Sequence, residues 1–455
     1  MVIGAPASGN GKTTVATGLM AALRRRGTAV AGVKVGPDYI DPGYHALATG
    51  APGRNLDPVL VGEQRVAPLA AHGSSGAEVT VVEGVMGLFD GRAGTADFGS
   101  AGFGSADFGS ADFGSTAHVA ALLGAPVLLV VDTRGQGRSL AALLHGFRSF
   151  DPAVRIAGVV LNRVGSDRHE EVCRQACAEV GLEVLGALRR DDGLAVPSRH
   201  LGLVTAAEHA AARQVVDGWA DAVAAQVDVD AVLRAAGMTG AAPWRPECEV
   251  TPADGQPVVT LAAGPAFAFG YAEHAELLAA AGARVATVDP LRDETLPPDT
   301  AGLVLPGGFP EEHAAELSAN AALRAQVAAL AASGAPVHAE CGGLLYLTRE
   351  LDGWPMCGVL DAVAAVTSGL TLGYRDAVAV SGSALHPEGA RVAGHEFHRS
   401  AVTPRAGTPA WRWANATPEG FVQRGVHASF LHTHPAGSPA AVARFVASCR
   451  QEERS

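Results

Sequence analysis

The chain is 455 residues long, which is enough for two or three domains at roughly 100 to 200 residues each. Apolar residues make up 48% of it and charged residues 18%, a composition that excludes general disorder and is typical of a folded globular protein. The net charge of −12, from 34 basic and 46 acidic residues, argues against nucleic acid or an anionic membrane as the main partner.

The cysteine usage and the apolar segments indicate a cytoplasmic protein. Six cysteines occur without a C-x-x-C pair, which is typical of a reduced compartment. The first residues lack the basic, apolar and cleavage regions of a signal peptide, and polar residues or proline interrupt the longest uncharged windows. We therefore expect neither secretion nor a membrane span.

In the first half of the chain, short apolar and β-branched runs alternate with helix-like stretches. This alternation predicts βαβ units and a parallel sheet, and therefore a doubly wound α/β domain over residues 1–230. A segment with four prolines, at 231–257, is interpreted as a linker. The expected strands are at 2–3, 79–82, 127–131 and 156–161, and the expected helices are at 13–26 and 139–147.

The phosphate-binding pattern GNGKTT at residues 9–14 follows the first expected strand and opens a helix. In this context backbone N–H groups and Lys12 can bind phosphate, and the Thr13 hydroxyl can bind Mg²⁺. The strict pattern has glycine at the place of Pro6, so the motif is a variant. A glycine turn with a solvent-facing lysine is the alternative. Regulatory ATPases of this class carry a lysine where this chain has Ala7, which argues against a partition or division switch.

Acidic side chains follow two further strands of the predicted first sheet. Asp38 and Asp41 come after the second apolar run, and Glu83 ends the third. Because strand ends are where doubly wound sheets bind ligands, we expect these carboxylates to hold Mg²⁺ and Lys34 to neutralise phosphate. Each aspartate alone is equally well explained as a turn former beside glycine or proline. The nearby phosphate loop favours the metal site.

Residues 96–115 are four tandem five-residue units, three of them ADFGS and one AGFGS. A period of five fits neither a solenoid nor a heptad, and glycine and serine favour a loop. We interpret 94–115 as an inserted surface loop rather than a functional lid.

From residue 258 a second alternating series predicts a second α/β domain, extending to 448. The expected strands are at 258–262, 284–288, 302–305 and 335–339, with a helix at 272–281.

In this second domain, Cys341 lies between a predicted strand and a predicted helix. The N-terminus of a helix lowers the pKa of a thiol, and such a turn exposes a nucleophile. His432 and His434, expected on one face of a strand, are the candidate bases. Gly308 and Gly342 can supply oxyanion N–H groups. The alternative is that Cys341 is a small buried apolar residue.

A cysteine pair and a histidine-containing segment are given no functional role. Cys173 and Cys177 are one helical turn apart and are expected to be core or surface thiols. The segment GHEFH at 394–398 resembles a metal-binding pair, but it lacks further ligands, so a structural turn is favoured.

A thiol site joined to an ATP site suggests one coupled reaction. Glutamine is hydrolysed at Cys341 through a thioester, which releases ammonia. ATP bound at Lys12 phosphorylates a substrate carboxylate, and ammonia then displaces the phosphate to form an amide.

The motifs of the chain closely resemble those of the cobyrinate or hydrogenobyrinate a,c-diamide synthase family of cobalamin biosynthesis. The resemblance covers nearly the whole chain in order. The motifs are GNGKTT at 9–14, KVGPDYIDPG at 34–43, NLDP at 55–58, EGVMGLFDG at 83–91, LNRVG at 161–165, RHLGL at 199–203, LPGG at 305–308, ECGG at 340–343 and SFLH at 429–432.

The resemblance implies an ATP domain related to dethiobiotin synthetase, followed by a class I-type glutamine amidotransferase domain. It also implies Mg²⁺ and amidation of the a and c acetate side chains of a corrin macrocycle, with ATP and glutamine as co-substrates. The partners are therefore small molecules, and whether the protein forms a homodimer stays open.

The resemblance also assigns roles to residues of this chain. ATP binding falls to Gly9, Asn10, Gly11, Lys12, Thr13, Thr14 and Lys34, with Asn162 at the adenine; the metal falls to Thr13, Asp38 and Glu83; and catalysis falls to Asp38, Asp41, Glu83, Cys341 and His432.

The amidotransferase motifs depart from the usual pattern at two places. His434 stands where ordinary glutamine amidotransferases have a glutamate, two residues after the histidine, so the third member of the triad is missing. Ala339 replaces the first glycine of the G-x-C-x-G elbow.

Two other functions stay open. One is that of cobyric acid synthase, which amidates other corrin side chains and is expected to differ in the loop at 34–41. The other is a non-enzymatic ATP-dependent scaffold with an inactive thiol domain. The sequence also leaves open whether the macrocycle contains cobalt.

Overall fold

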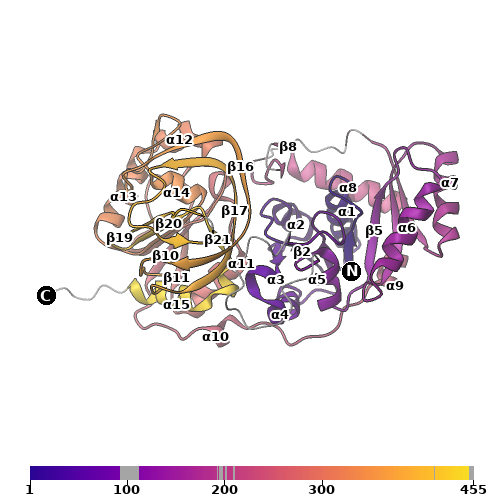
Figure 1. Cartoon of the computed structure of the whole chain (residues 1–455), viewed down its shortest axis with the longest axis horizontal. Coiled ribbons are helices and arrows are strands. Elements are labelled where there is room, and N and C mark those ends of the chain that lie inside the picture. The colour runs from indigo at the N-terminus through magenta and orange to yellow at the C-terminus, as the bar shows by residue number, and fades with distance from the viewer. Residues whose placement is uncertain are drawn as a thin grey trace. The chain divides into compact units, whose positions relative to one another are not determined.

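A computed structural model of the chain describes residues 1–92, 112–191, 193, 198–199, 202–208, 211–414 and 416–449 (Figure 1). The chain divides into two compact units, with the division between Trp244 and Arg245. Most of the expected insertion at 94–115 falls outside the described residues.

The N-terminal unit is built on a seven-stranded parallel sheet with the order β3-β2-β4-β1-β5-β6-β7. Its central strands are buried because helices cover both faces, which explains their nearly continuous apolar sequences. The strands are β1 (Val2–Gly4), β2 (Val30–Val35), β3 (Arg54–Leu56), β4 (Val79–Glu83), β5 (Val127–Asp132), β6 (Ile156–Val164) and β7 (Val184–Arg189).

The helices and a short hairpin complete this unit. They are α1 (Lys12–Arg25), α2 (Asp41–Thr49), α3 (Pro58–Val61), α4 (Glu63–Gly73), α5 (Thr116–Leu122), α6 (Ser139–Phe150), α7 (Asp167–Glu179), α8 (Ala212–Gln226) and α9 (Val229–Ala235), with the hairpin strands β8 (Ser198–Arg199) and β9 (Gly202–Leu203). Since β2, β4 and β1 are neighbours, the loops that follow them meet at one edge of the sheet. Lys34 lies opposite Glu83 in the register of β2 and β4.

The C-terminal unit contains a first sheet with the order β11-β10-β12-β13-β20-β19, parallel except for β19. Its strands are β10 (Val258–Ala262), β11 (Arg284–Val288), β12 (Thr300–Leu305), β13 (Val337–Glu340), β19 (Phe421–Gln423) and β20 (Val426–Ser429). The helical segments are α10 (Pro246–Glu249), η3 (Pro265–Phe267), α11 (Ala272–Ala280), η4 (Pro310–His313), α12 (Ala314–Ala319), α13 (Ala321–Ala332), α14 (Gly342–Leu347), η5 (Pro435–Gly437) and α15 (Pro439–Ser448).

A second, mixed sheet in this unit was not predicted from the sequence. It has the order β15-β14-β16-β17-β21, and β18 also pairs with β16. Its strands are β14 (Glu350–Leu351), β15 (Trp354–Pro355), β16 (Val363–Ala379), β17 (Arg391–Thr403), β18 (Trp411–Arg412) and β21 (His432–Thr433). The segment 394–398, expected to be a turn, lies within β17 because it pairs along β16. The segment of His432 and His434, expected to be a strand, follows β20 and forms only the short strand β21, which belongs to the other sheet; His434 lies just beyond it.

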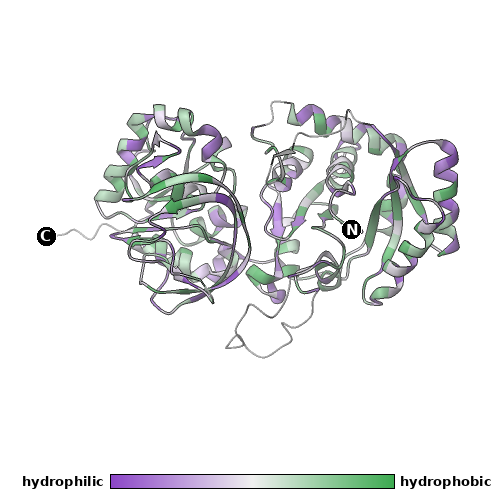
Figure 2. Ribbon diagram, turned by 45° about the horizontal axis from the view of Figure 1, so that its top comes forward, coloured by the Kyte–Doolittle hydropathy of each residue, from purple (hydrophilic) through white to green (hydrophobic). Residues whose placement is uncertain are grey.

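Hydropathy follows this architecture. Figure 2 shows that the strands of the parallel sheets are mainly hydrophobic, while hydrophilic residues gather on the outer helices. In the C-terminal unit the core extends to the nucleophile turn itself, since Cys341, Leu344 and Tyr346 belong to one buried apolar cluster. Among the described helices, none combines the length and apolarity that crossing a bilayer requires.

Candidate active sites

The loop from β1 to α1 has the backbone of a phosphate-binding loop. Gly9 and Gly11 have positive φ angles of 78° and 97°, which favour glycine. A Cβ on Gly11 would lie 2.1 Å from Nδ2 of Asn162, so no larger residue fits there. Asn162 donates from this Nδ2 to the carbonyl of Asn10 at 2.8 Å, and Arg163 donates to the carbonyl of Gly9 at 2.8 Å. The end of β6 therefore supports the loop.

Lys12 is buried, in contrast to the solvent-facing lysine of the alternative interpretation. Its Nζ donates to the carbonyl of Met86 at 2.5 Å and to that of Ala7 at 3.3 Å. Burial, and secondarily the charge of Lys34, lowers the pKa of Lys12 to about 8. The lysine is therefore held at the loop, and its pKa lies close enough to neutral pH for a bound anion to favour its charged form.

A buried ionic cluster lies next to the loop. The Nζ of Lys34 lies 2.6 Å from Oδ2 of Asp41 and 3.0 Å from Oε1 of Glu83. The Thr13 hydroxyl, in the first turn of α1, donates to the same Glu83 oxygen at 2.6 Å and lies 3.4 Å from Oδ2 of Asp41. The structure thus brings together four of the predicted residues, from three separate segments of the chain.

The carboxylates of this cluster are only partly balanced by positive charge. Burial, together with the charges of Asp38 and Glu83, raises the pKa of Asp41 well above its usual value. Burial also acts to raise the pKa of Glu83, but Lys34 and a hydrogen bond from His45 hold it below its usual range. The cluster can therefore accept a further cation, because Asp41 gains stability when its negative charge is neutralised.

Asp38 lies at the edge of this cluster. Its Oδ1 accepts the N–H groups of Ile40 and Asp41 at 2.8 and 3.1 Å, which fixes the entry into α2. Its Oδ2 lies 4.0 Å from Nζ of Lys34. Asn55, from the NLDP motif, donates to the carbonyls of Gly36 and Asp38 at 2.8 and 2.6 Å and holds this loop.

Sequence reasoning missed His45. Its Nε2 lies 2.7 Å from Oε2 of Glu83, and the ring is fully buried while its Nδ1 has no hydrogen-bond partner. The one signal in the sequence was spacing, since His45 comes four residues after Asp41 and so shares a face of α2 with it.

In the C-terminal unit, Cys341 sits on a strained turn between β13 and α14. Its φ of 46° and ψ of −102° place a non-glycine residue in a rarely occupied region. Cys341 is 4% exposed, and the backbone N–H of Gly342 points at its thiol. Burial, and secondarily Glu311, nevertheless raises the pKa of the thiol well above its usual value. The expected lowering by the helix terminus is therefore wrong for this resting state, because desolvation outweighs one N–H.

A glycine turn after β12 lies against both Cys341 and His432. A Cβ on Gly342 would lie 2.9 Å from the N atom of Gly308, and a Cβ on Gly307 would lie 2.4 Å from Cε1 of His432. The turn thus contacts the nucleophile segment on one side and the imidazole on the other. The Gly308 and Gly342 backbones, predicted as oxyanion donors, are adjacent.

The structure distinguishes the two candidate bases. The ring of His432 stacks on His395, with centroids 4.9 Å apart and planes 9° apart, and burial lowers its pKa to about 4. It is therefore neutral at pH 7 and able to accept a proton. His434 instead caps η5, accepting the N–H of Ala436 on Nδ1 at 3.2 Å, and its ring lies 4.1 Å from that of Tyr271. These contacts favour His432.

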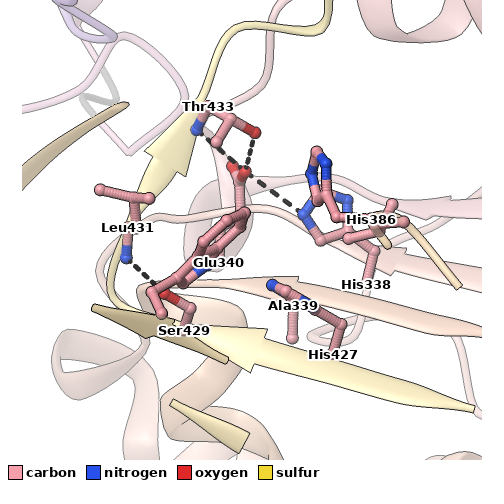
Figure 3. A pocket seen from close by; sticks show the side chains of 10 residues that line it. His338, Ala339, Glu340, His386, His427, Ser429, Leu431 and Thr433 are labelled. Atoms are coloured by element: carbon pink, nitrogen blue, oxygen red, sulfur yellow. Dashed lines mark hydrogen bonds and ion pairs between the residues drawn. The ribbon is translucent and has the colours of Figure 1, made fainter. Parts of the chain in front are cut away.

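Behind β13 there is a buried polar pocket, shown in Figure 3. Glu340 lies at its centre, between Thr433 and His338. The other lining residues are Ala339, Leu385, His386, Trp411, His427, Ser429 and Leu431. Across the residues that the structure describes, no three or more His, Cys, Asp or Glu side chains form a metal-binding group, here or at 394–398.

Two family models match the chain. Residues 1–204 match the CobQ/CobB/MinD/ParA nucleotide binding domain, and residues 258–440 match the CobB/CobQ-like glutamine amidotransferase domain. A hydrogenobyrinate a,c-diamide synthase from Mycobacterium tuberculosis H37Rv is 60% identical, over 98% of this chain and 97% of its own length. The chain belongs to the a,c-diamide synthase family.

Other members of the a,c-diamide synthase family are also similar over the full length. A hydrogenobyrinate a,c-diamide synthase from Streptomyces coelicolor is 55% identical, over 99% of this chain and 97% of that protein. A cobyrinate a,c-diamide synthase from Gloeobacter violaceus is 43% identical, over 99% and 96%. The family and the fold class predicted from the motifs are confirmed.

Proposed function

We propose that this protein is a glutamine-hydrolysing ligase that amidates the a and c acetate carboxylates of a corrin macrocycle. The observation that carries the proposal is that one member of the a,c-diamide synthase family contains two sites. One is a phosphate loop beside a buried ionic cluster, and the other is a cysteine elbow with a neutral histidine in the same unit. The first site can activate a carboxylate, and the second can release ammonia.

In the C-terminal unit, Cys341 attacks the side-chain amide carbon of glutamine after its proton passes to His432. The N–H groups of Gly308 and Gly342 are the proposed donors to the oxyanion. Ammonia leaves with the proton from the imidazole, and water then hydrolyses the thioester to glutamate. Burial keeps the resting thiol protonated. Glutamine binding is therefore the proposed trigger for transfer of the thiol proton to His432.

In the N-terminal unit, the corrin carboxylate attacks the γ-phosphate of ATP, which gives an acyl phosphate and ADP. Lys12 and the amides of residues 9–14 bind the phosphates, and Lys34 neutralises charge on the transferred group. Asn162, which supports the loop, is the proposed contact of the nucleotide's base. Ammonia then displaces phosphate from the acyl carbon, so each amide formed consumes one ATP and one glutamine.

Mg²⁺ is the proposed metal. The Thr13 hydroxyl already lies beside Glu83 and Asp41 oxygens, and an all-oxygen donor set suits this hard cation. Thr13 and Glu83 are proposed as its ligands, with Asp38 acting through water from the edge of the cluster. When bound, Mg²⁺ would neutralise phosphate charge. Few protein ligands are required, because Mg²⁺ keeps waters and nucleotide oxygens.

The cobalt-free macrocycle, hydrogenobyrinic acid, is the proposed substrate. Relatives named for hydrogenobyrinate are 52 to 60% identical to this chain, whereas those named for cobyrinate are 39 to 43% identical. Purified protein supplied with ATP, Mg²⁺ and glutamine should convert hydrogenobyrinic acid into its diamide, as followed by mass spectrometry. Faster turnover of cobyrinic acid would overturn the choice of substrate, and consumption of neither ATP nor glutamine would overturn the function.

The cytoplasm is the proposed location, supported by six free cysteines and by the use of ATP and glutamine. A homodimer is the proposed assembly. It is supported by the apolar side chains Val366, Leu370 and Leu372, which are exposed on β16. Light scattering after gel filtration tests it, and a monomer mass would contradict it.

A further inference from the structure

His432 lacks the acidic partner that usually follows it in the sequence, since His434 occupies that place and caps η5. The structure supplies a carboxylate from another position, the residue directly before the nucleophile. Oε2 of Glu340 lies 3.8 Å from Nδ1 of His432. Both residues are buried, at 9% and 1% exposure.

Glu340 is held firmly in this orientation. Its Oε1 accepts the N–H of Thr433 at 3.0 Å and the Thr433 hydroxyl at 2.8 Å, and it lies 3.3 Å from Nε2 of His338 (Figure 3). Because these contacts all fall on one oxygen, the carboxylate cannot rotate freely. Oε2 is the oxygen that remains turned toward His432.

The charge states suit a base and its partner. Burial acts to raise the pKa of Glu340, but the hydrogen bond and charge of His338, followed by His432 and Thr433, hold it at about 2. Glu340 is therefore ionised at pH 7, while His432 is neutral. The separation of 3.8 Å is long for a hydrogen bond, and such contacts tighten when the base takes up its proton.

Other charged and titratable groups near His432 are less suitable partners. On β17, His395 is stacked on the ring and neutral, and Glu396 is paired with Arg375 at 2.7 Å. His398 of β17 and His338 of β13 act only to lower the pKa of His432. Of the carboxylates that act on His432, Glu340 has the larger effect.

We propose that Glu340 is the positioning residue for His432 and takes the place of the missing acid of the amidotransferase triad. The carboxylate holds the proton of the imidazole on Nδ1, so Nε2 is the unprotonated nitrogen that receives the thiol proton from Cys341. The imidazolium then faces an ionised carboxylate, which stabilises the thiolate–imidazolium pair. This inference rests on the proposed roles of Cys341 and His432.

The test is Glu340→Gln in the full-length protein, which keeps the shape of the side chain but removes its charge. Release of glutamate from glutamine should fall by about 10²- to 10⁴-fold, while amidation with added ammonium chloride should stay within about twofold. The Glu340 charge also acts directly on the thiol and raises its pKa, so its removal has two opposing effects. The pH profile of Cys341 alkylation by iodoacetamide should shift to higher pH, because the imidazolium that stabilises the thiolate loses its partner, and this loss is expected to outweigh the relief of the direct repulsion. A merely structural role would leave that profile in place.

The matched control is Glu419→Gln. Glu419 is also buried, and it accepts a hydrogen bond from the Ser429 hydroxyl at the end of a strand. Burial raises the pKa of Glu419 to about 7, so the glutamine amide of the variant resembles the protonated carboxyl group. It should change neither the glutaminase rate nor the alkylation profile. Glu340→Asp, which retains the charge, should recover part of the activity.

An unchanged alkylation profile in Glu340→Gln would overturn the inference. If Glu340→Gln showed no thermal unfolding transition, Thr433→Val would be used in its place. This variant removes one of the hydrogen bonds that hold Glu340, so it should shift the alkylation profile in the same direction. Cys341→Ala distinguishes a failure of this inference from a failure of the proposed function. Glutamine hydrolysis that persists in Cys341→Ala would contradict the proposed function. Loss of hydrolysis in Cys341→Ala, together with normal hydrolysis in Glu340→Gln, would contradict only the role of Glu340.

Discussion

The two candidate sites bury their reactive groups in different electrostatic settings. In the N-terminal unit, Lys34 lies 2.6 Å from Asp41 and 3.0 Å from Glu83, so ion pairs hold the site together before any ligand arrives. In the C-terminal unit, the thiol of Cys341 and the ring of His432 are both buried in their neutral forms. The first site is therefore prepared to bind charge, whereas the second must create charge during its reaction.

The sharpest way to separate the two sites is Cys341→Ala. Glutamine hydrolysis should fall on the order of 10⁴-fold or more, because no other group can form the thioester, while amidation with added ammonium should remain. Glutamate release and diamide formation are measured in parallel. Cys357→Ala removes another buried thiol of the same unit and should leave both rates nearly unchanged. Loss of the ammonium-dependent reaction in Cys341→Ala would mean that the sites are not separate.

Lys12→Ala should produce the opposite result. Amide formation should fall about 10³-fold or more with either nitrogen source, because the lysine of the phosphate loop contacts the transferring phosphate. Glutamate release without ATP should continue. Arg138→Ala, which removes an exposed ion pair with Glu179, serves as the control. Ammonium-dependent turnover at the normal rate in Lys12→Ala would contradict the role of this lysine.

The pH dependence of ATP binding sharpens the comparison further. Because the pKa of Lys12 is lowered to about 8, the free enzyme carries its charge below that pH and loses it above. ATP must then bind with uptake of one proton, so its KM should rise up to about tenfold per pH unit above pH 8. Lys12→Arg, which stays protonated, should flatten this rise. A flat profile in the unmodified protein would show that Lys12 does not meet the phosphates.

A further expected difference is in acid stability. Burial lowers the pKa of His274, His386 and His432 to about 4, so the unfolded chain binds more protons than the folded unit between pH 6.5 and 4. The C-terminal unit should therefore lose about 1.4 kcal/mol per pH unit for each of these histidines as pH falls through that window. Hydrogen exchange at pH 7 and pH 5 should show β13 and β20 losing protection before β1 and β4. His386→Asn should weaken the effect.

Local sequence patterns were enough to predict the parallel sheets and the grouping of Thr13, Lys34, Asp41 and Glu83. Each of these residues follows or opens an apolar strand or helix, and parallel strands bring their ends together. The nucleophile turn was predictable for the same reason. All of this information lies within a few residues of each side chain.

The remaining features depend on contacts between distant segments. The long strand β16 has mostly exposed or half-exposed side chains along its first two thirds, so it lacks the alternation that reveals a strand. The high pKa of the Cys341 thiol follows from burial, which a helix terminus in the sequence does not reveal. The contact of Glu340 with His432 joins residues 92 positions apart, across two sheets.

The passage of the chain from β20 to β21 has a practical consequence for dissecting the protein. Cys341 follows a strand of the first sheet of the C-terminal unit, while His432 belongs to the second. A minimal fragment that kept only the parallel layer and omitted the β16–β17 hairpin would retain the sulfur but leave the imidazole without the strand that seats it. A fragment of the C-terminal unit should therefore hydrolyse glutamine only when it contains both sheets.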